Sequence, residues 1–280
     1  FSRIDIRNHR KIVVIDGEVA YTGSQNMVDP DVFKKEAGVG NWVDVMVKVE
    51  GPVVESLAGT FLSDWVLETD IGQFRPEILH NDMSTMRTTG DIKKRPIVGH
   101  SAVQLVPSGP AFVPEAIHSL LLTTIYAARQ ELIMTTPYFI PDEPLLAALK
   151  AAAQRGVTVK IIVPKDNDSR LVKYASRARY MELTDAGVEI FLFHGGLLHS
   201  KTITVDGSFS LFGSVNLDMR SFWLNFEATL FIYCETFTKE LLAVQEDYLS
   251  QSEELDIVAF SERSVVERFK ENVTATKLKP

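Results

Sequence analysis

The stretch Asn8-His9-Arg10-Lys11-Ile12-Val13-Val14-Ile15-Asp16-Gly17 has a second copy in Leu198-His199-Ser200-Lys201-Thr202-Ile203-Thr204-Val205-Asp206-Gly207. Both copies read His, any residue, Lys, four residues, Asp. The agreement extends downstream, because Gly23-Ser24-Gln25-Asn26 and Gly213-Ser214-Val215-Asn216 lie at the same distance from the two histidines. Each motif alone would be weak evidence, since short motifs often match by chance. Two copies with one spacing indicate a chain built from two related halves.

Each copy is predicted to form a β-hairpin. Residues 11–15 and 201–205 are rich in β-branched side chains, and each run ends in Asp-Gly, a strong hairpin signal. Alternate residues of a strand share one face, so His9 and Lys11 point the same way. Two registers are open at this point. A loop of residues 16 and 17 places His9 opposite Ser24, whereas a loop of residues 17 and 18 places it opposite Asn26.

In either register, four polar side chains of each copy lie on one face. An imidazole, an ammonium, a hydroxyl and an amide supply what a phosphoryl group needs: a nucleophile or acid, a positive charge and neutral donors. The candidates are His9, Lys11, Ser24 and Asn26 in the first copy, and His199, Lys201, Ser214 and Asn216 in the second. Asp16 and Asp206 have the opposite parity and lie at the turn, so we expect them to fix the hairpin or contact the other half.

The two copies resemble the HKD motifs of the phospholipase D superfamily, and the surrounding sequence is similar to bacterial cardiolipin synthases in particular. The matching stretches are residues 8–30, 37–40, 135–141, 195–201 and 216–227. The resemblance implies an α/β, phospholipase D-like duplicated fold, in which two mixed, mostly parallel sheets are flanked by helices and the active site lies between the halves. It places both aspartates of the motifs, Asp16 and Asp206, among the catalytic residues. It also implies that Asp44 and Glu227, on strands after the motifs, hydrogen-bond the non-reacting nitrogen of a catalytic histidine.

The duplication predicts how the chain is divided. Alternating apolar strands and amphipathic helices precede the second motif, which favours a sheet covered by helices. We expect residues 1–68 to be the C-terminal part of the first half, 69–100 a linker, 101–251 the second half and 252–280 a tail. The segment before the second motif has no counterpart before the first, so the N-terminal part of the first half is expected to be missing.

Composition supports a globular enzyme acting on something other than nucleic acid. The chain has 280 residues, of which 45% are hydrophobic and 24% charged, with a formal net charge of −8. A protein that holds a nucleic-acid backbone is expected to show a basic stripe, and none is evident. The sequence contains no metal-binding spacing, so neither a metal nor another cofactor is expected. A basic stretch, residues 151–201, is predicted either to meet anionic lipid or to be a solvated helix face.

The membrane is the expected setting, although no run of eighteen apolar residues occurs in this chain. The resembling synthases carry membrane-spanning helices before this region, so the intact protein is expected in the bacterial inner membrane. The tail is predicted to contain an amphipathic helix, with Val265, Val266, Phe269 and Val273 on one face. That face either rests on the membrane interface or packs on the protein body.

The resemblance and the chemistry together predict cardiolipin synthesis from two molecules of phosphatidylglycerol. One histidine attacks phosphorus to give a phosphohistidine, and the other protonates the leaving alkoxide and later activates the incoming hydroxyl. The resemblance favours His9 as nucleophile and His199 as acid and base, although the sequence is symmetric on this point. The alternatives are hydrolysis of lipid phosphodiesters, a nuclease, or a non-catalytic membrane scaffold. The donor lipid and the oligomeric state stay open.

Overall fold

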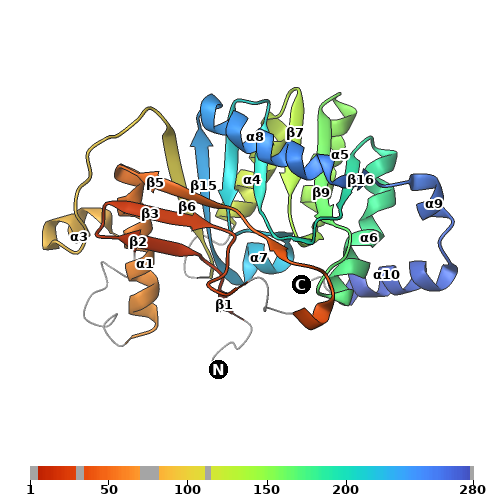
Figure 1. The fold of residues 1–280 in the computed structure, drawn as a ribbon, viewed down its shortest axis with the longest axis horizontal. Helices are drawn as coiled ribbons and strands as arrows, with labels where there is room; N and C mark the ends of the chain where they lie inside the picture. Colours follow the sequence, from red (N-terminus) through yellow and green to blue (C-terminus); the bar gives the residue numbers. More distant parts are fainter. Residues whose placement is uncertain (1–5, 30–34, 70–81, 111–114, 278–280) are drawn as a thin grey trace.

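A large mixed sheet and a small antiparallel sheet, both flanked by helices, make up the computed structural model, which describes residues 6–29, 35–69, 82–110 and 115–277 (Figure 1). The mixed α/β architecture predicted from the sequence is confirmed. Among the described residues, the large sheet has nine strands and the small sheet three.

The centre of the large sheet is parallel. Strands β7 (Glu131–Thr135), β9 (Thr158–Pro164) and β10 (Glu189–Phe193) run side by side, connected through α5 (Glu143–Gln154) and α6 (Arg170–Asp185). These strands are apolar runs buried on both faces, which is what a sheet with helices packed on it requires. The predicted alternation of strands and helices is therefore confirmed in this region.

The rest of the large sheet is mainly antiparallel, so the prediction of mostly parallel sheets is wrong. Hairpin strands β12 (Thr202–Val205) and β13 (Phe209–Gly213) pair antiparallel with each other and with their neighbours β7 and β15 (Asn225–Tyr233). Strand β6 (Ala102–Ser108) also runs antiparallel to β15. The tight turn at Asp206-Gly207 makes β12 and β13 antiparallel by returning the chain beside itself, whereas the helical crossovers keep β7, β9 and β10 parallel.

The small sheet belongs to the first motif. Its strands β2 (Ile12–Ile15), β3 (Val19–Gly23) and β5 (Met46–Glu50) are all antiparallel neighbours. Helix α1 (Pro52–Leu67) follows, with Pro52 in its first turn, where proline fits best. The region predicted to be a linker contains α3 (Met83–Thr89), capped by Asp82. The linker residues 70–81 lie outside the described part.

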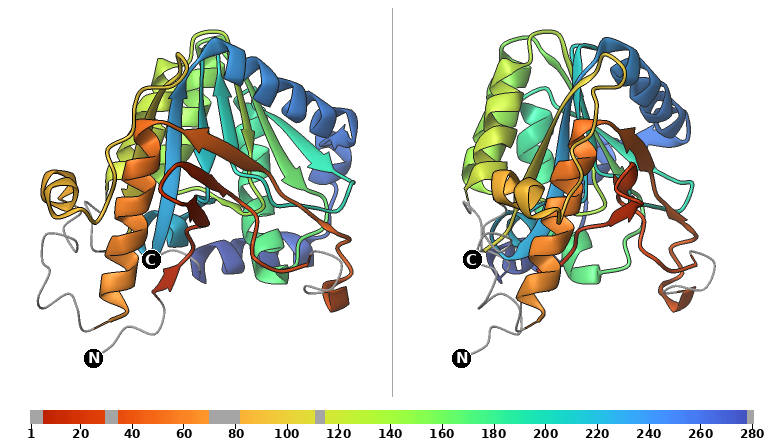
Figure 2. Two further views of the ribbon diagram at one scale, coloured as in Figure 1. Left: turned by 60° about the vertical axis from the view of Figure 1, so that its left-hand side comes forward. Right: turned by 90° about the vertical axis from the view of Figure 1, so that its left-hand side faces the viewer.

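Helices cover both faces of the large sheet. Helices α4 (Ala116–Ala127) and α5 lie on one face and α8 (Glu235–Ser250) on the other (Figure 2). The sequence predicts a helix over residues 112–130 here, and Phe112, its expected start, lies outside the described residues. A shared cluster of buried apolar side chains joins the small sheet and α1 to the large sheet and α8; it includes Ala20, Val54, Leu57, Leu230, Ile232 and Leu241. The two halves therefore share one core.

Both hairpins have a register that the sequence reasoning did not anticipate. Ile15 pairs with Val19, and Val205 pairs with Phe209, so three residues separate the paired ends of the strands. In the first hairpin the chain reverses at Asp16 and Gly17, both with positive φ, and Glu18 is an additional residue on the returning strand. Neither of the two predicted registers occurs, because both assumed a two-residue loop.

The C-terminal region forms β16 (Ser252–Glu254), α9 (Ile257–Ser261) and α10 (Val265–Lys277). Helix α10 packs along α6, and its apolar face points away from the protein, so the packing alternative for that face is wrong. Within the ranges that the structure describes, no helix combines the length and apolar character needed to cross a membrane.

The basic stretch 151–201 is largely neutralised. Lys165, Lys173, Arg177 and Arg179 each form an ion pair with an acidic side chain. This pairing favours the alternative of a solvated, salt-bridged helix face over that of a lipid-binding cluster. Arg170, at the start of α6, is exposed.

Candidate active site

Two short strands bring each histidine to the opposite half of the molecule. Strand β1 (Arg7–Asn8) runs parallel to β15, and the next amide, that of His9, donates to Phe226 O at 2.8 Å. In the same way β11 (Leu197–Leu198) runs parallel to β4 (Trp42–Val43), and the amide of His199 donates to Val43 O at 2.8 Å. Since Glu227 and Asp44 are the next residues on the partner strands, each histidine lies beside a carboxylate from the other half.

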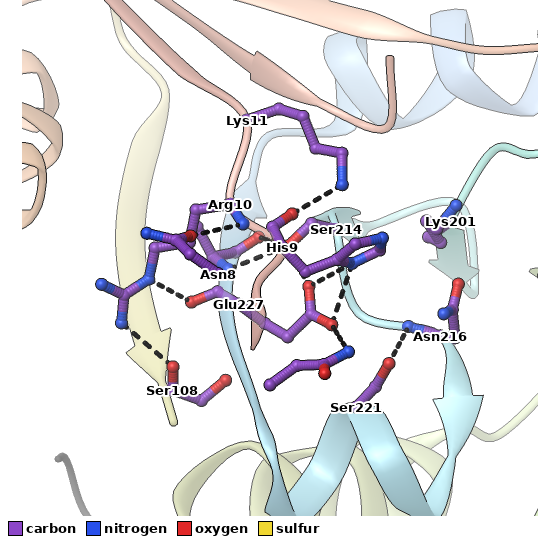
Figure 3. Close-up of polar contacts among 12 residues, drawn as sticks. Asn8, His9, Arg10, Lys11, Ser108, Lys201, Ser214, Asn216, Ser221 and Glu227 are labelled. Carbon is purple, nitrogen blue, oxygen red and sulfur yellow. Dashed lines mark hydrogen bonds and ion pairs between the residues drawn. The ribbon is translucent and has the colours of Figure 1, made fainter. Parts of the chain in front are cut away.

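His9 is held by Glu227. Its Nδ1 lies 3.0 and 2.9 Å from the two carboxylate oxygens of this fully buried residue (Figure 3). Glu227 also accepts from Ser214 Oγ at 2.5 Å and from Asn225 Nδ2 at 3.1 Å. Three donors around one carboxylate fix its orientation, and the carboxylate fixes the imidazole.

His199 is held by Asp44 in the equivalent way. Its Nδ1 lies 2.6 Å from Asp44 Oδ1, which also accepts from Ser24 Oγ at 2.6 Å. The Trp42 ring lies against the imidazole, with centroids 4.4 Å apart. Burial and the charge of Lys201 lower the pKa of His199 to about 3, although Asp44 opposes the shift. His199 is therefore neutral near pH 7.

The protonation of Asp44 determines the tautomer of His199. Burial alone would raise the pKa of Asp44, but the hydrogen bonds from His199 and Ser24, together with Lys201, hold it below its usual value. An ionised carboxylate only accepts hydrogen bonds, so Nδ1 of His199 carries the hydrogen. The lone pair is then on Nε2, where a nucleophile or base needs it.

The two serines differ from the sequence prediction in what they contact. Ser24 and Ser214 are buried, and their hydroxyls donate to Asp44 and Glu227 rather than face an open cavity. Each also accepts from a backbone amide of the neighbouring strand, from Val45 and Ala228 respectively, at 3.0 Å. Their hydroxyls therefore orient the carboxylates that orient the histidines.

The two lysines occupy equivalent places in the two motifs. Lys11 Nζ donates to His9 O at 2.7 Å, and Lys201 Nζ donates to His199 O, so both motifs share one local geometry. Burial lowers the pKa of Lys11 to about 8, with Glu227 and Asp44 opposing the shift. Burial and then the charge of Lys11 lower the pKa of Lys201. The charge of Lys11 acts on both His199 and Lys201 of the second motif, so the two motifs face one site.

An open cavity of about 670 Å³ lies beside the first motif. Its lining includes His9, Lys11, Asn26, Met27 and Val28. Asn26 therefore faces the space in which a substrate would lie.

In the second motif, the equivalent asparagine, Asn216, is buried beside Lys201 (Figure 3). Within the described ranges, its Oδ1 has no hydrogen-bond partner. Its backbone is fixed, because the Asn216 amide donates to Ser221 Oγ.

The two motif aspartates stand apart from this chemistry. Asp206 accepts from three consecutive backbone amides, those of residues 129–131, at 2.7 to 3.3 Å. Asp16 is exposed at the turn of its hairpin. Both lie at the far end of their strands from the lysines, so the assignment of Asp16 and Asp206 as catalytic residues is replaced by a role at the turn. Asp206 holds the chain before β7, within its own half.

Sequence reasoning missed three residues that support the site. Arg10 fills the unspecified position of the first motif, and its guanidinium donates to Glu227 O, Ser108 O and the carboxylate of Asp64. Asn225 donates a hydrogen bond to Glu227, which orients His9, and Trp42 packs against the ring of His199. Of the three, only Asn225 could have been found from the sequence, because it lies two residues before Glu227 and therefore on the same face of the strand.

Two imidazoles, each hydrogen-bonded to a carboxylate and accompanied by a lysine, suit nucleophilic and acid–base chemistry on an anionic phosphodiester. Among the described residues, no group of three or more His, Cys, Asp or Glu is placed to hold a metal ion.

Comparison with known sequences points to the same family as the paired motifs. Residues 121–248 match the family model of the cardiolipin synthase, phospholipase D-like domain. Cardiolipin synthase A of Yersinia pseudotuberculosis and that of Yersinia pestis are each 51% identical to the chain over 271 residues, which is 97% of the chain. The chain spans about half the length of these relatives, 54%.

Comparison with solved structures supports the fold alone. The crystal structure of phosphatidylserine synthase from Haemophilus influenzae superimposes with a TM-score of 0.70 at 16% identity, over 98% of this chain and 69% of that one. From its sequence, its paired motifs and its fold, the chain belongs to the phospholipase D-like family that includes the cardiolipin synthases.

Proposed function

We propose that the protein is a phosphatidyltransferase that makes cardiolipin from two molecules of phosphatidylglycerol. The observation that carries the proposal is the crossed pair of histidines, each hydrogen-bonded through Nδ1 to a carboxylate of the other half. Two imidazoles so held can divide the work of a two-step transfer, in which one forms a covalent bond to phosphorus and the other moves protons. The 51% identity to cardiolipin synthase A supports the choice of lipid.

The surroundings of the histidines support His199 as the nucleophile, the reverse of the assignment that the resemblance favoured. Neutral His199 offers its Nε2 lone pair to phosphorus, while His9, partly exposed and against Glu227, is placed to carry a proton as an imidazolium. The new P–N bond forms as the P–O bond to glycerol breaks, and His9 gives its proton to the departing alkoxide.

The second step reverses the first. His9, now neutral, takes the proton from a hydroxyl of the second phosphatidylglycerol, and the resulting alkoxide attacks phosphorus as the P–N bond breaks. Cardiolipin leaves, and both histidines return to their starting states. Lys11, Lys201 and Asn26 stabilise the charge on the phosphoryl oxygens.

We also propose that residues up to 68 and residues 101–251 act as two halves that each contribute one motif. The resemblance set out above further supports placing the complete protein at the bacterial inner membrane, through N-terminal helices outside this chain.

The test is to identify the lipid products of the full-length enzyme reconstituted with phosphatidylglycerol, by mass spectrometry. Cardiolipin and glycerol in equal amounts are expected, with both lost in His9→Ala and in His199→Ala. His194→Ala is the matched control, because His194 is exposed and pairs with Glu253 outside the site. Phosphatidic acid without cardiolipin would mean that water is the acceptor, and the synthase proposal would then be wrong.

A further inference from the structure

Helix α10 presents its apolar face to solvent and its polar face to the protein. Val265, Val266 and Phe269 are 73%, 62% and 67% exposed. On the opposite face, Glu271 is only 1% exposed and Thr274 is also buried. An amphipathic surface helix of a globular protein normally has the reverse arrangement, with its apolar stripe toward the core.

Buried ion pairs fix this orientation. Glu271 accepts from Arg177 on α6 at 2.9 Å and from Arg263 at 2.8 Å. Both guanidinium groups also lie over the ring of Phe260, at 5.1 and 3.8 Å from its centroid. Rolling the helix to bury its valines would leave a charged cluster without partners, which is strongly unfavourable. The exposure of the apolar face is therefore built into the packing.

This face lies at the end of the molecule where β1 leads into the active-site residue His9. Figures 1 and 2 show α10, the C-terminal end of α1 and β1, which leads into His9, at the same end. Helix α10 lies along this edge instead of projecting from it (Figure 1). Further large apolar side chains are exposed on the elements of this edge: Phe61, Trp65 and Leu67 on α1, Leu171 at the start of α6, and Met27 and Val28 lining the cavity.

The charges beside the apolar stripe suit an anionic surface. At 100° per residue, Arg268 and Lys270 flank the stripe of α10 on its two sides, and both are exposed. Arg170 is exposed beside Leu171 on α6. Apolar residues flanked by basic ones, in a helix that lies along a surface, are the pattern of interfacial membrane helices.

We propose that α10, together with the end of α1, is a docking face that holds the open side of the active site against an anionic lipid bilayer. The choice of a bilayer over a protein partner rests partly on the proposed function, because a diacyl substrate can then present its phosphodiester while its acyl chains stay in the membrane. The docking face would keep the chain oriented on the bilayer surface, independently of any membrane anchor elsewhere in the protein.

Vesicle co-sedimentation of the 280-residue chain tests the docking without turnover. We expect Val266→Glu with Phe269→Glu to weaken binding to phosphatidylglycerol-containing vesicles at least tenfold. The matched control is Val258→Glu with Tyr126→Glu, which adds the same charge at exposed positions on α9 and at the end of α4; it should bind like the wild type. His9→Ala should bind normally too, which separates a failure of docking from a failure of the proposed chemistry.

Unchanged vesicle binding by the α10 double variant, or no binding by the wild type, would overturn the proposal. So would a stable wild-type dimer, seen by light scattering, that becomes monomeric in the double variant, since a second copy would then cover the face. In the full-length protein with Trp65→Phe, which removes the native tryptophan of the docking face, Phe269→Trp should introduce fluorescence that brominated lipid quenches, while Val258→Trp should not. Absence of that quenching would mean that protein covers the face instead of lipid.

Discussion

At the scale of single residues, the two histidines occupy equivalent positions but have different surroundings. His199 is buried against Trp42 and Asp44, whereas His9 is partly exposed against Glu227. If His199 is the nucleophile, the first step needs His9 only to protonate a poor leaving group. A phosphodiester with a nitrophenol leaving group should therefore still phosphorylate His199 in His9→Ala, and the adduct should accumulate because the base for the second step is absent.

Mass spectrometry of the acid-sensitive phosphohistidine checks this expectation, with His199→Ala as the paired variant. A covalent adduct on His9 in His199→Ala, with none in His9→Ala, would restore the assignment that the resemblance favoured.

Lys11 predicts an alkaline limit on activity. Its pKa is lowered to about 8, mainly by burial, so the ammonium is charged below that pH and loses its proton above it. Since the charge offsets the phosphoryl oxygens, kcat/KM should fall about tenfold per pH unit above pH 8. A soluble short-chain phosphatidylglycerol, assayed between pH 6 and 10, gives the profile. Lys11→Arg should move the limit beyond pH 10, because arginine stays charged; an unmoved limit would assign it to another group.

The sequence alone predicted which residues gather in the site better than it predicted what each of them contacts. His, Lys and Asn of both motifs do lie around one site, but strand alternation does not explain it. With Ile12 paired to Thr22 and Thr202 to Phe212, alternation alone would put each asparagine on the face opposite its lysine, so the chain beyond the strand ends brings them together. The serines were assigned to phosphate, yet they bond Asp44 and Glu227. That contact depends on where two distant strands meet, and spacing within a motif carries no information on it.

At the scale of secondary-structure elements, the glycine that begins each Gly-Ser-x-Asn motif permits a close approach of strands. A Cβ at Gly213 would lie 2.3 Å from Ala228 O and 2.8 Å from Thr229 Cα, both backbone atoms of β15. Gly213→Ala should therefore lower the free energy of unfolding by about 3 kcal/mol and displace Ser214 from Glu227.

The hairpin turn supplies a matched control for this substitution. Gly207 has φ +62° but open space around it, so Gly207→Ala should cost only about 1 kcal/mol, from backbone strain. Urea unfolding followed by circular dichroism measures both variants. Equal destabilisation of the two would show that strand approach is not what Gly213 permits.

Long apolar strands and helices were predictable because their periodicity extends over many residues. The five-residue α7 (Met219–Trp223) was not, because it is too short to show a helical period and Trp223 is as apolar as the strand β15 that follows. The two-residue strands β1, β4 and β11 are too short to show any period. They are set by pairing between the halves, which the local sequence does not specify.

At the scale of the whole molecule, Arg10 ties the first motif to the large sheet. Its buried guanidinium links α1, β6 and β15 through Asp64, Ser108 O and Glu227 O. Arg10→Ala should lower the free energy of unfolding by about 3 to 5 kcal/mol, because it leaves a carboxylate and two carbonyls without their partner. Arg10→Lys should rescue only part of this loss, since lysine lacks the planar, forked donor geometry.

Denaturant unfolding measures the loss, and hydrogen exchange at β1 and β2 should speed up in Arg10→Ala. Arg7→Ala serves as the control, because Arg7 is exposed on the neighbouring strand. Stability of Arg10→Ala equal to that of Arg7→Ala would mean that the shared apolar core alone joins the halves.

The crossed carboxylates have a consequence for how such a site can arise and change. Each half carries one histidine and one carboxylate, and each carboxylate orients the histidine of the other half. Asp44 orients His199, and Glu227 orients His9. A polypeptide with a single motif would lack a carboxylate for its own histidine and could work only by exchanging carboxylates with a twin. Fusing the two copies into one chain removes any dependence on protein concentration. It also lets the two histidines diverge, one toward a buried neutral state and the other toward a proton carrier, which identical twins could not do.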